Sequence, residues 1–373
     1  MQDIKIVFFD TETTGLKEED RILQIAYSVV SLKDLLNGVL FYKEEYIKPP
    51  VDISPSSAAI HGIWYQDIDD AKEFKNSNAI TDFEKFIEDE SVYFVAHNEI
   101  FDRNMLTKED IFLPRKRTLD TLRLLKLFAD EHSDCEKTSL QYFRYYFDFH
   151  SDKKKIFIND QGTLMSNQEI FKTLVKNYKV KNIVAHSALS DVIVLHMLFI
   201  VLLSVRYNFD FKKLYEDCFK PIFITRINFG KVFEHGTLFE DVACLNYVDS
   251  YGKQRSGLNY LNWVIKNMDT ISLEDKVAIS NAVINCLKNH KINNIVDLKP
   301  MIEFAATFLP EHWEYLTNYL EIDIEQTRNT KIKEIEDIIS ALLNSSDDKN
   351  HKRGLELKEI FDFLLVRVEN YLY

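Results

Sequence analysis

The fold of this chain is decided by residues 8–16, which read FFDTETTGL. They overlap the end of an apolar run at residues 4–9, which predicts a β-strand. Side chains alternate across a strand, so Asp10 and Glu12, two positions apart, point to the same side at its carboxyl end. Acids are rare among strand residues that pack inward. This pair therefore indicates a functional site rather than a core position.

Two further segments carry acids next to apolar elements. Residues 92–102, VYFVAHNEIFD, run from an apolar strand into a helix whose first turn holds Asp102. Residues 183–195, IVAHSALSDVIVL, place His186 five positions before Asp191, which begins the most apolar helix of the chain. Each acid alone has an ordinary explanation as a strand end or a helix cap. Their joint pattern favours one shared site.

Four carboxylates at one edge of a sheet would repel one another and could not all ionise without cations. Oxygen ligands select hard divalent ions, so we expect Mg²⁺ or Mn²⁺, two per active site. Two such ions about 3.5 to 4 Å apart can hold both the attacking water and the leaving oxygen of a phosphodiester. His186 can accept a proton near neutral pH and is the expected general base. His97 and Asn98 are expected to orient their turn by hydrogen bonds rather than to bind metal.

The order of elements predicts an α/β fold with a mixed sheet flanked by helices. Three β-rich runs joined by short polar turns indicate an antiparallel meander, at residues 4–9, 22–30 and 39–47. Predicted helices then alternate with two short strands, the helices at residues 81–88, 101–109 and 121–131 and the strands at residues 92–96 and 117–120. The run at residues 192–205 is too short for a membrane span and predicts a buried helix.

The three motifs resemble those of the DEDDh 3′-5′ exonucleases of the DnaQ type, which include the proofreading subunit of bacterial DNA polymerase III, exonuclease X and ribonuclease T. The resemblance covers about residues 4–205 and implies a ribonuclease H-like fold. It implies the following roles: metal ligands Asp10, Glu12, Asp102 and Asp191, with His186 as the general base. The sister subclass has a tyrosine four residues before the last aspartate, where this chain has Ser187.

The same resemblance extends to the segments DRILQIA and SAAIHGI, at residues 20–26 and 57–63. It implies a pocket for the terminal nucleotide. The expected substrate-binding residues are Thr11, Thr13, Ile60, His61, Asn98 and Phe101. Residues 150–182 are an insertion, interpreted as a hairpin and a helix. The lysines at residues 153–155 are interpreted as a solvated turn, with contact to a nucleic-acid backbone as the alternative.

Residues 221–268 predict a small α+β module, and residues 269–373 predict a helical bundle. Part of the first region resembles the glycine-lysine module of some exonuclease X-like proteins, through Phe229, Gly230, Lys231, Gly236, Tyr260, Leu261 and Trp263. This module is either a nucleic-acid clamp or a structural hairpin with Trp263 as its core. In the bundle, Ser272 and Asp275 predict a capping box. Its acidity favours a protein partner or self-association over direct contact with nucleic acid.

Composition excludes several classes of protein. The chain is 46% hydrophobic and 13% aromatic, with 9 Gly and 7 Pro among 373 residues, which excludes a disordered or collagen-like chain. The net charge of −13 divides into −8 for residues 1–205, +2 for residues 206–268 and −7 for residues 269–373. Four cysteines without paired short spacing favour a reducing compartment. With no secretory peptide or membrane span expected, we predict a cytoplasmic protein.

The sequence therefore predicts a metal-dependent 3′-5′ exonuclease that releases nucleoside 5′-monophosphates from single-stranded or frayed nucleic acid. DNA is favoured over RNA because the appended module resembles that of exonuclease X. An exoribonuclease that trims RNA is the first alternative. The second alternative is a non-catalytic scaffold that binds nucleic-acid ends, against which the intact set of acids argues.

Overall fold

The computed structural model describes residues 4–372, apart from residues 133, 228, 231, 235, 250, 269–270, 290, 292–297 and 346. The chain divides into two compact units. Unit 1 comprises residues 1–128 and 137–218, and unit 2 comprises residues 129–136 and 219–373. Both the expected module and the expected helical domain fall within unit 2, so their separation from each other stays a prediction.

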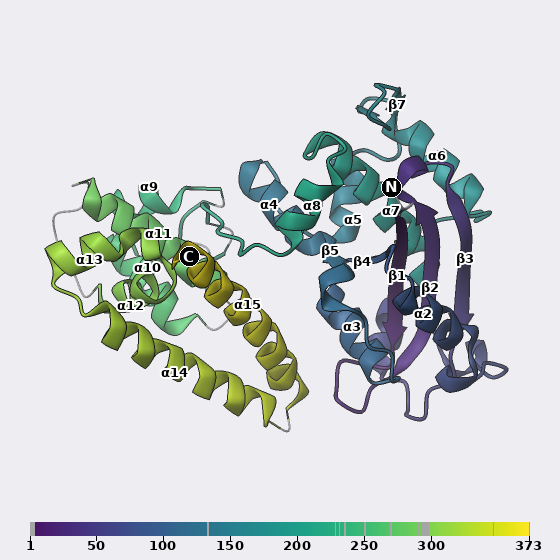
Figure 1. The fold of residues 1–373 in the computed structure, drawn as a ribbon, viewed down its shortest axis with the longest axis horizontal. Coiled ribbons are helices and arrows are strands. Elements are labelled where there is room, and N and C mark those ends of the chain that lie inside the picture. The colour runs from purple at the N-terminus through teal and green to yellow at the C-terminus, as the bar shows by residue number, and fades with distance from the viewer. Residues whose placement is uncertain are drawn as a thin grey trace. The chain divides into compact units, whose positions relative to one another are not determined.

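Unit 1 is built on a five-stranded mixed sheet in the order β3-β2-β1-β4-β5 (Figure 1). The strands are β1 (Lys5–Thr13), β2 (Ile22–Ser31), β3 (Val39–Tyr46), β4 (Val92–Ala96) and β5 (Thr118–Asp120). The first three strands form an antiparallel meander, and β4 and β5 continue the sheet in parallel with β1. The predicted α/β, ribonuclease H-like fold class is therefore confirmed.

The first strand is longer than its apolar run predicts. It pairs with β2 as far as Thr13, so Asp10 and Glu12 lie inside the strand and not beyond it. Along β4 the pairing ends earlier, with Phe8 opposite Val95. The last residues of β1 therefore extend past the end of β4. This leaves the two acids at an edge of the sheet that other elements can reach.

Helices surround this sheet. They are α1 (Pro55–His61), α2 (Asn78–Glu88), α3 (Glu99–Thr107), α4 (Thr121–Glu131), α5 (Leu140–Tyr146), α6 (Asn167–Asn177), α7 (Ala188–Val205) and α8 (Phe211–Cys218). Short 3₁₀ helices are η1 (Leu32–Asp34), η2 (Tyr65–Asp67), η3 (Phe74–Asn76) and η4 (Arg115–Arg117). The predicted helix at 121–131 and the predicted strand at 92–96 are reproduced to the residue.

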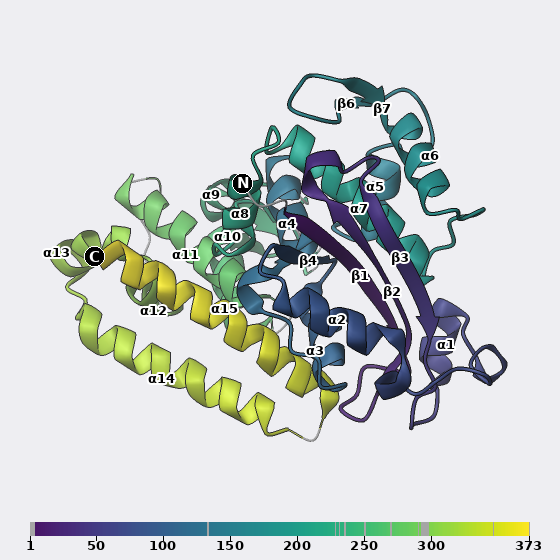
Figure 2. The same cartoon turned by 45° about the vertical axis from the view of Figure 1, so that its right-hand side comes forward.

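The two faces of β1 pack against different helices. Phe9 faces α2, where its ring meets that of Phe83 at 5.8 Å. Phe8 faces α7, where its ring stacks on that of His196 at 4.6 Å. Figure 2 shows α2 and α7 on opposite sides of the strands. Because Asp10 and Glu12 continue the even-numbered positions of β1, the alternation places them on the face covered by α7.

Helix α7 is the central buried helix of unit 1 and packs on β1 and β2. Among the described residues, it is the one helix long and apolar enough to cross a membrane, and 89% of it is buried inside the structure. Its polar side chain His196 is fully buried, with Nδ1 lying 2.9 Å from the Tyr178 hydroxyl. Burial lowers the pKa of His196 to about 3, so this ring is neutral. The predicted buried helix is confirmed.

The inserted segment forms a hairpin followed by a helix, as expected. Strands β6 (Lys155–Phe157) and β7 (Leu164–Ser166) pair in antiparallel fashion and lead into α6. Of the three lysines before and in β6, Lys154 donates to the carbonyl of Tyr146 at 2.6 Å, with its ammonium 4.7 Å from that ring. This lysine therefore closes the end of α5, which supports the interpretation of a structural turn at this position.

Unit 2 is mainly helical, as predicted. Its elements are α9 (Phe239–Cys244), β8 (Asn246–Val248), β9 (Gln254–Ser256), α10 (Gly257–Asn267), α11 (Leu273–Lys288), α12 (Lys299–Phe308), η5 (Pro310–His312), α13 (Trp313–Leu320), α14 (Ile324–Leu343) and α15 (Asp348–Leu372). The predicted capping box of Ser272 and Asp275 begins α11. Trp263 is 53% exposed, so it is not the core of a structural hairpin, whereas Leu261 is buried. Lys231 of the expected motif lies outside the described residues.

Candidate active site

The acids of the three motifs come together at the carboxyl end of β1. Asp10 and Glu12 lie on this strand, on the side of α7. Asp102 comes from the first turn of α3, and Asp191 comes from the first turn of α7. The charges of the other three carboxylates act on Asp10. The four predicted ligands therefore form one cluster.

Asp102 is held in the cluster by the strand itself. Its Oδ1 accepts two hydrogen bonds from Thr11, one from the backbone N–H at 2.9 Å and one from the hydroxyl at 2.6 Å. Both residues are buried, with exposed fractions of 2% for Asp102 and 5% for Thr11. Thr11 is thus a positioning residue for Asp102. The expected contact of Thr11 with substrate stays a prediction.

Asp191 is held from two directions. Its Oδ2 accepts the backbone N–H of His186 at 3.1 Å, and its Oδ1 accepts the side-chain amide of Gln141, on α5, at 2.6 Å. His186 itself has a positive φ of 59°, a conformation that costs energy for a side-chain-bearing residue. The bond to Asp191 helps to fix this turn. The exposed imidazole of His186 therefore stands beside the acid that holds its backbone.

Three of the clustered side chains lie close enough to share a cation. One ligand atom each from Glu12, His186 and Asp191 lies within 4.8 Å of the others. Two carboxylate oxygens and one imidazole nitrogen at such a spacing suit a divalent ion. Asp10 and Asp102 add carboxylates next to this group, so the donor set fits the predicted metals.

Electrostatics agree with a site that needs cations. Burial raises the pKa of Asp10 well above its ordinary value, and the three neighbouring carboxylates raise it further. Burial, together with the charges of Asp191 and Asp102, raises the pKa of Glu12 to about 8. Burial also raises the pKa values of Asp102 and Asp191, against hydrogen bonds that lower them. Without cations, these acids retain protons that free acids would lose.

Two residues expected to bind the terminal nucleotide, Ile60 and His61, lie on α1. His61 Nδ1 accepts the backbone N–H of Ile63 at 3.0 Å, so Nε2 carries the proton and donates to the carbonyl of Thr13 at 3.2 Å. Burial lowers the pKa of His61, the bond to Thr13 opposes this, and the charge of His186 lowers it again. Ile60, on the same helix, is 60% exposed and free to contact a base. The structure thus brings α1 to the catalytic cluster.

The remaining predicted substrate residues are Thr13, Asn98 and Phe101. Thr13 is buried and its hydroxyl donates to the carbonyl of Gly15 at 2.8 Å, so it shapes the loop that follows β1. Asn98 has a φ of 66° and its backbone N–H donates to Asp120 at 2.9 Å, which supports the expected role in orienting the turn. Phe101 is half-buried at the start of α3. Its ring packs against the hydrophobic core of the sheet.

The loop after β1 depends on Gly15. A Cβ at this position would lie 2.3 Å from the carboxylate of Asp20, which would force that side chain away. Asp20 is needed where it is, because it accepts the hydroxyl of Thr14 at 2.7 Å and the backbone N–H of Lys17 at 2.6 Å. The loop leaves Leu16 63% exposed beside the site.

Sequence reasoning missed two polar residues that hold the site. One is Gln141, and the other is Gln24, which is 2% exposed in β2. The side-chain oxygen of Gln24 accepts the backbone N–H of Ala188 at 3.1 Å, so one of the unpaired N–H groups at the beginning of α7 has a partner. The available signal for Gln24 was its amide side chain, the one amide within the otherwise mainly apolar run ILQIAYSVV. Gln141 has no such signal, because the sequence around it does not show which element it faces.

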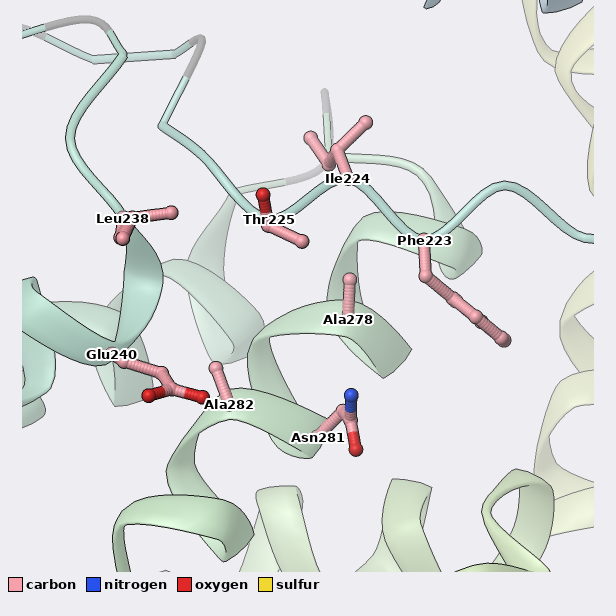
Figure 3. A pocket seen from close by; sticks show the side chains of 8 residues that line it. All are labelled: Phe223, Ile224, Thr225, Leu238, Glu240, Ala278, Asn281 and Ala282. Carbon is pink, nitrogen blue, oxygen red and sulfur yellow. The ribbon is translucent and has the colours of Figure 1, made fainter. Parts of the chain in front are cut away.

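A separate pocket lies within unit 2 and has a volume of about 280 Å³. Its walls are formed by the segment 223–225, by α9 and by α11 (Figure 3). Its polar side chains already have partners, since Glu240 lies 3.4 Å from the Lys291 ammonium and Asn281 lies 2.7 Å from His312. None of the predicted site residues lines this pocket. We assign no function to it.

Comparison with known proteins finds similarity mainly in unit 1. Residues 7–154 match the family model RNase_T, described as exonuclease. No curated protein matches the sequence significantly. Among solved structures, exonuclease X in complex with 5′-overhanging duplex DNA is similar, with 18% identity, coverage of 57% of this chain and 99% of that chain, and a TM-score of 0.37. The nuclease domain of 3′hExo, a DEDDh family member bound to rAMP, has 12% identity, coverage of 54% and 92%, and a TM-score of 0.34.

The cell-death related nuclease CRN-4 has 14% identity, coverage of 53% of this chain and 63% of that chain, and a TM-score of 0.34. These low values leave the function to be argued from the site itself. Most of the residues that match the exonuclease family model belong to unit 1. Its acids and His186 follow the DEDDh arrangement of residues. The resemblance of residues 226–268 to a glycine-lysine module finds no support in these comparisons.

Proposed function

We propose that this protein is a divalent-metal-dependent 3′-5′ exonuclease that hydrolyses the terminal phosphodiester of single-stranded or frayed nucleic acid and releases nucleoside 5′-monophosphates. The convergence of Asp10, Glu12, Asp102 and Asp191 beside His186 carries this proposal. A carboxylate cluster with raised pKa values has no structural benefit by itself, because it costs folding free energy. It is explained if a ligand of opposite charge binds there.

The proposed cofactors are Mg²⁺ or Mn²⁺, two per site, held by the four carboxylates. When bound, such ions stabilise the negative charge that develops on the phosphate and leaving oxygens. Thr11 engages one oxygen of Asp102 and leaves the other for a cation. Gln141 and the His186 backbone orient both oxygens of Asp191. These contacts preorganise the carboxylates before a cation arrives.

The proposed general base is His186, whose imidazole takes a proton from the attacking water. Its ring is exposed and stands beside Glu12 and Asp191, so it faces the position that the substrate phosphate would occupy. Ile60 on α1 and Leu16 in the loop after β1 are exposed, and we assign these apolar side chains to contact with the terminal bases. This arrangement suits an end of a strand rather than the middle of a duplex, because stacked and paired bases do not present their faces.

DNA is the favoured substrate in this proposal, with support from the resemblance of residues 226–268 to the module of exonuclease X-like proteins. The similar solved structures include complexes described with DNA and with a ribonucleotide. A protein partner or self-association is proposed for the helices of residues 269–373. The four cysteines are free thiols in the structure, which supports a reducing compartment such as the cytoplasm.

The decisive experiment incubates the pure protein with 5′-labelled and 3′-labelled single strands of DNA and RNA in Mg²⁺. A 3′-5′ exonuclease produces a ladder from the 5′-labelled strand and a labelled mononucleotide from the 3′-labelled strand. Faster loss of the RNA would favour the exoribonuclease alternative. Binding of both strands without any shortening would overturn the proposal in favour of an end-binding scaffold.

A further inference from the structure

Next to the carboxylate cluster lies an arginine that the proposed chemistry does not use. Arg144 is on α5, one helical turn after Gln141, so the two side chains share a face of the helix. Its Nη1 lies 3.5 Å from Oε1 of Gln141, and the amide of the same Gln141 donates to Asp191 at 2.6 Å. One side chain therefore separates the guanidinium from a predicted metal ligand.

The other contacts of Arg144 are with neutral groups. Its Nε–H donates to Nε2 of His150 at 3.0 Å, and its guanidinium lies 5.7 Å from the centre of the Phe171 ring. Within the described part of the chain, no carboxylate lies within ion-pair distance of this guanidinium. A guanidinium has five N–H donors, and these contacts use two of them.

An arginine without an acid partner is unexpected in this unit. Residues 1–205 carry 33 acids against 25 basic residues, so carboxylates are in excess. Other arginines of unit 1 are paired with acids, as Arg103 is with Glu99 at 2.8 Å. The remaining N–H groups of Arg144 have no acceptor among the described residues.

The surface beside Arg144 suits a strand of nucleic acid. Tyr145, the next residue on α5, is 68% exposed, and its ring lies 5.3 Å from that of His150. Exposed aromatic rings beside a cation are the pattern by which proteins bind single strands, with bases stacked and phosphates neutralised. The exposed Lys153 of the insertion continues the basic character beyond His150.

We infer that Arg144 forms a binding subsite for one internucleotide phosphate of the substrate strand, with Tyr145 as a stacking surface for an adjacent base. Two N–H groups of a guanidinium match two oxygens of a phosphodiester, which lysine cannot reproduce. The bridge through Gln141 places this phosphate near the one that is cleaved. This inference rests on the proposed function in that the substrate is a nucleic acid.

The first test measures binding separately from turnover. The full-length Asp10→Asn variant, which should not cleave, is titrated in Mg²⁺ with a 5′-fluorescent single strand of about twelve nucleotides, over about 50 to 200 mM salt. Adding Arg144→Gln should weaken binding about tenfold and make the slope of log K against log salt shallower by about 0.7. Arg144→Lys should keep the slope, because the charge remains, but bind more weakly than Arg144.

The matched control is Lys75→Gln, which removes the same charge from an exposed lysine whose ammonium is held by Glu73 at 2.7 Å. It should change neither the affinity nor the slope. Melting temperatures of all variants show whether the fold is intact. An unchanged salt slope in a folded Arg144→Gln protein would overturn the subsite.

The second test identifies the phosphate. Strands with one neutral methylphosphonate at successive positions from the 3′ end are bound to protein with Arg144 and to the Arg144→Gln variant. At one position, the methylphosphonate should weaken binding by the protein with Arg144. In the Arg144→Gln variant the same methylphosphonate should have no further effect, as a double-mutant cycle requires. Equal losses at every position in both proteins would contradict the inference. These assays measure binding and not cleavage. If the subsite is present but the protein has no nuclease activity, the proposed function is wrong and the inference about Arg144 stands.

Discussion

The side-chain amide of Gln141 donates a 2.6 Å hydrogen bond to Oδ1 of Asp191, while the backbone of His186 donates to Oδ2 of the same residue at 3.1 Å. Both oxygens of this carboxylate are therefore oriented, one by α5 and one by the turn before α7. Each oxygen keeps a second lone pair for a cation. This orientation is a property of the protein alone, which makes its contribution measurable by substitution.

Gln141→Met keeps the volume of the side chain and removes the donor. We expect turnover to fall by about ten to a hundredfold and the Mg²⁺ concentration for half-maximal binding to rise, because residues that orient metal ligands typically have effects of this size. Metal binding is measured by calorimetry and turnover by release of mononucleotides. The control is Gln161→Met in the exposed hairpin turn. Unchanged metal affinity and turnover would show that the bond to Asp191 is incidental.

Asp10→Asn should abolish turnover and leave the metal-free protein as stable as before, or more stable. The reason is that Asn removes one of four repelling acids while keeping the shape of the side chain. Thermal unfolding in EDTA measures this, with Asp160→Asn on the exposed hairpin as the control. A melting temperature several degrees lower in the Asp10→Asn variant would argue against a shared carboxylate site.

The metal-free protein should lose stability as the pH rises from about 4.5 to about 8. Glu12 keeps its proton to about pH 8 in the folded protein, whereas its ordinary pKa is 4.5. In this window the folded state binds more protons than the unfolded state, so its stability falls with rising pH. Urea unfolding in EDTA at several pH values measures the slope. Glu12→Gln should flatten the slope of stability against pH, and added Mg²⁺ should do the same. A stability that rises across the window would be inconsistent with the buried cluster.

His186→Ala should lower the rate by about a hundredfold to ten thousandfold, which is the usual contribution of a general base. Mg²⁺ binding should persist, because the four carboxylates and the backbone bond to Asp191 remain. Added imidazole should restore part of the rate, since it can take the proton in place of the lost side chain. Loss of metal binding in this variant would make His186 a ligand rather than a base.

Metal replacement tests the donor set as a whole. Exhaustive EDTA treatment should abolish turnover, and Mg²⁺ or Mn²⁺ should restore it, because carboxylate oxygens prefer hard divalent ions. Ca²⁺ should bind without efficient turnover, since it is larger and less strict in its coordination geometry. Activity that survives EDTA would contradict the proposed mechanism.

Local sequence patterns were enough to predict most elements of unit 1. Strand β4 and helix α4 begin and end at the predicted residues, because apolar runs and turn residues determine both. The end of β1 was predicted four residues too early. Its last residues are polar, and their extended conformation comes from pairing with β2, which the apolar pattern of β1 does not show.

The three motifs were also enough to predict that Asp10, Glu12, Asp102 and Asp191 lie together, because these acids follow strand and helix signals. The supporting contacts depend on tertiary structure. Gln141 lies fifty positions before Asp191, and no periodicity or spacing relates them. Such contacts form because helices packed on one sheet bring distant side chains together.

The grouping of the chain into units was likewise decided by tertiary structure. Residues 129–131 end α4 and residues 132–136 follow it directly, yet all of them belong to unit 2. Asp130 explains why, since its carboxylate accepts the backbone N–H of Thr225 at 2.7 Å and its carbonyl accepts Nε–H of Arg226 at 3.2 Å. These hydrogen bonds join positions about a hundred residues apart. A local pattern cannot predict them, because their free energy depends on partners that only the folded chain brings within reach.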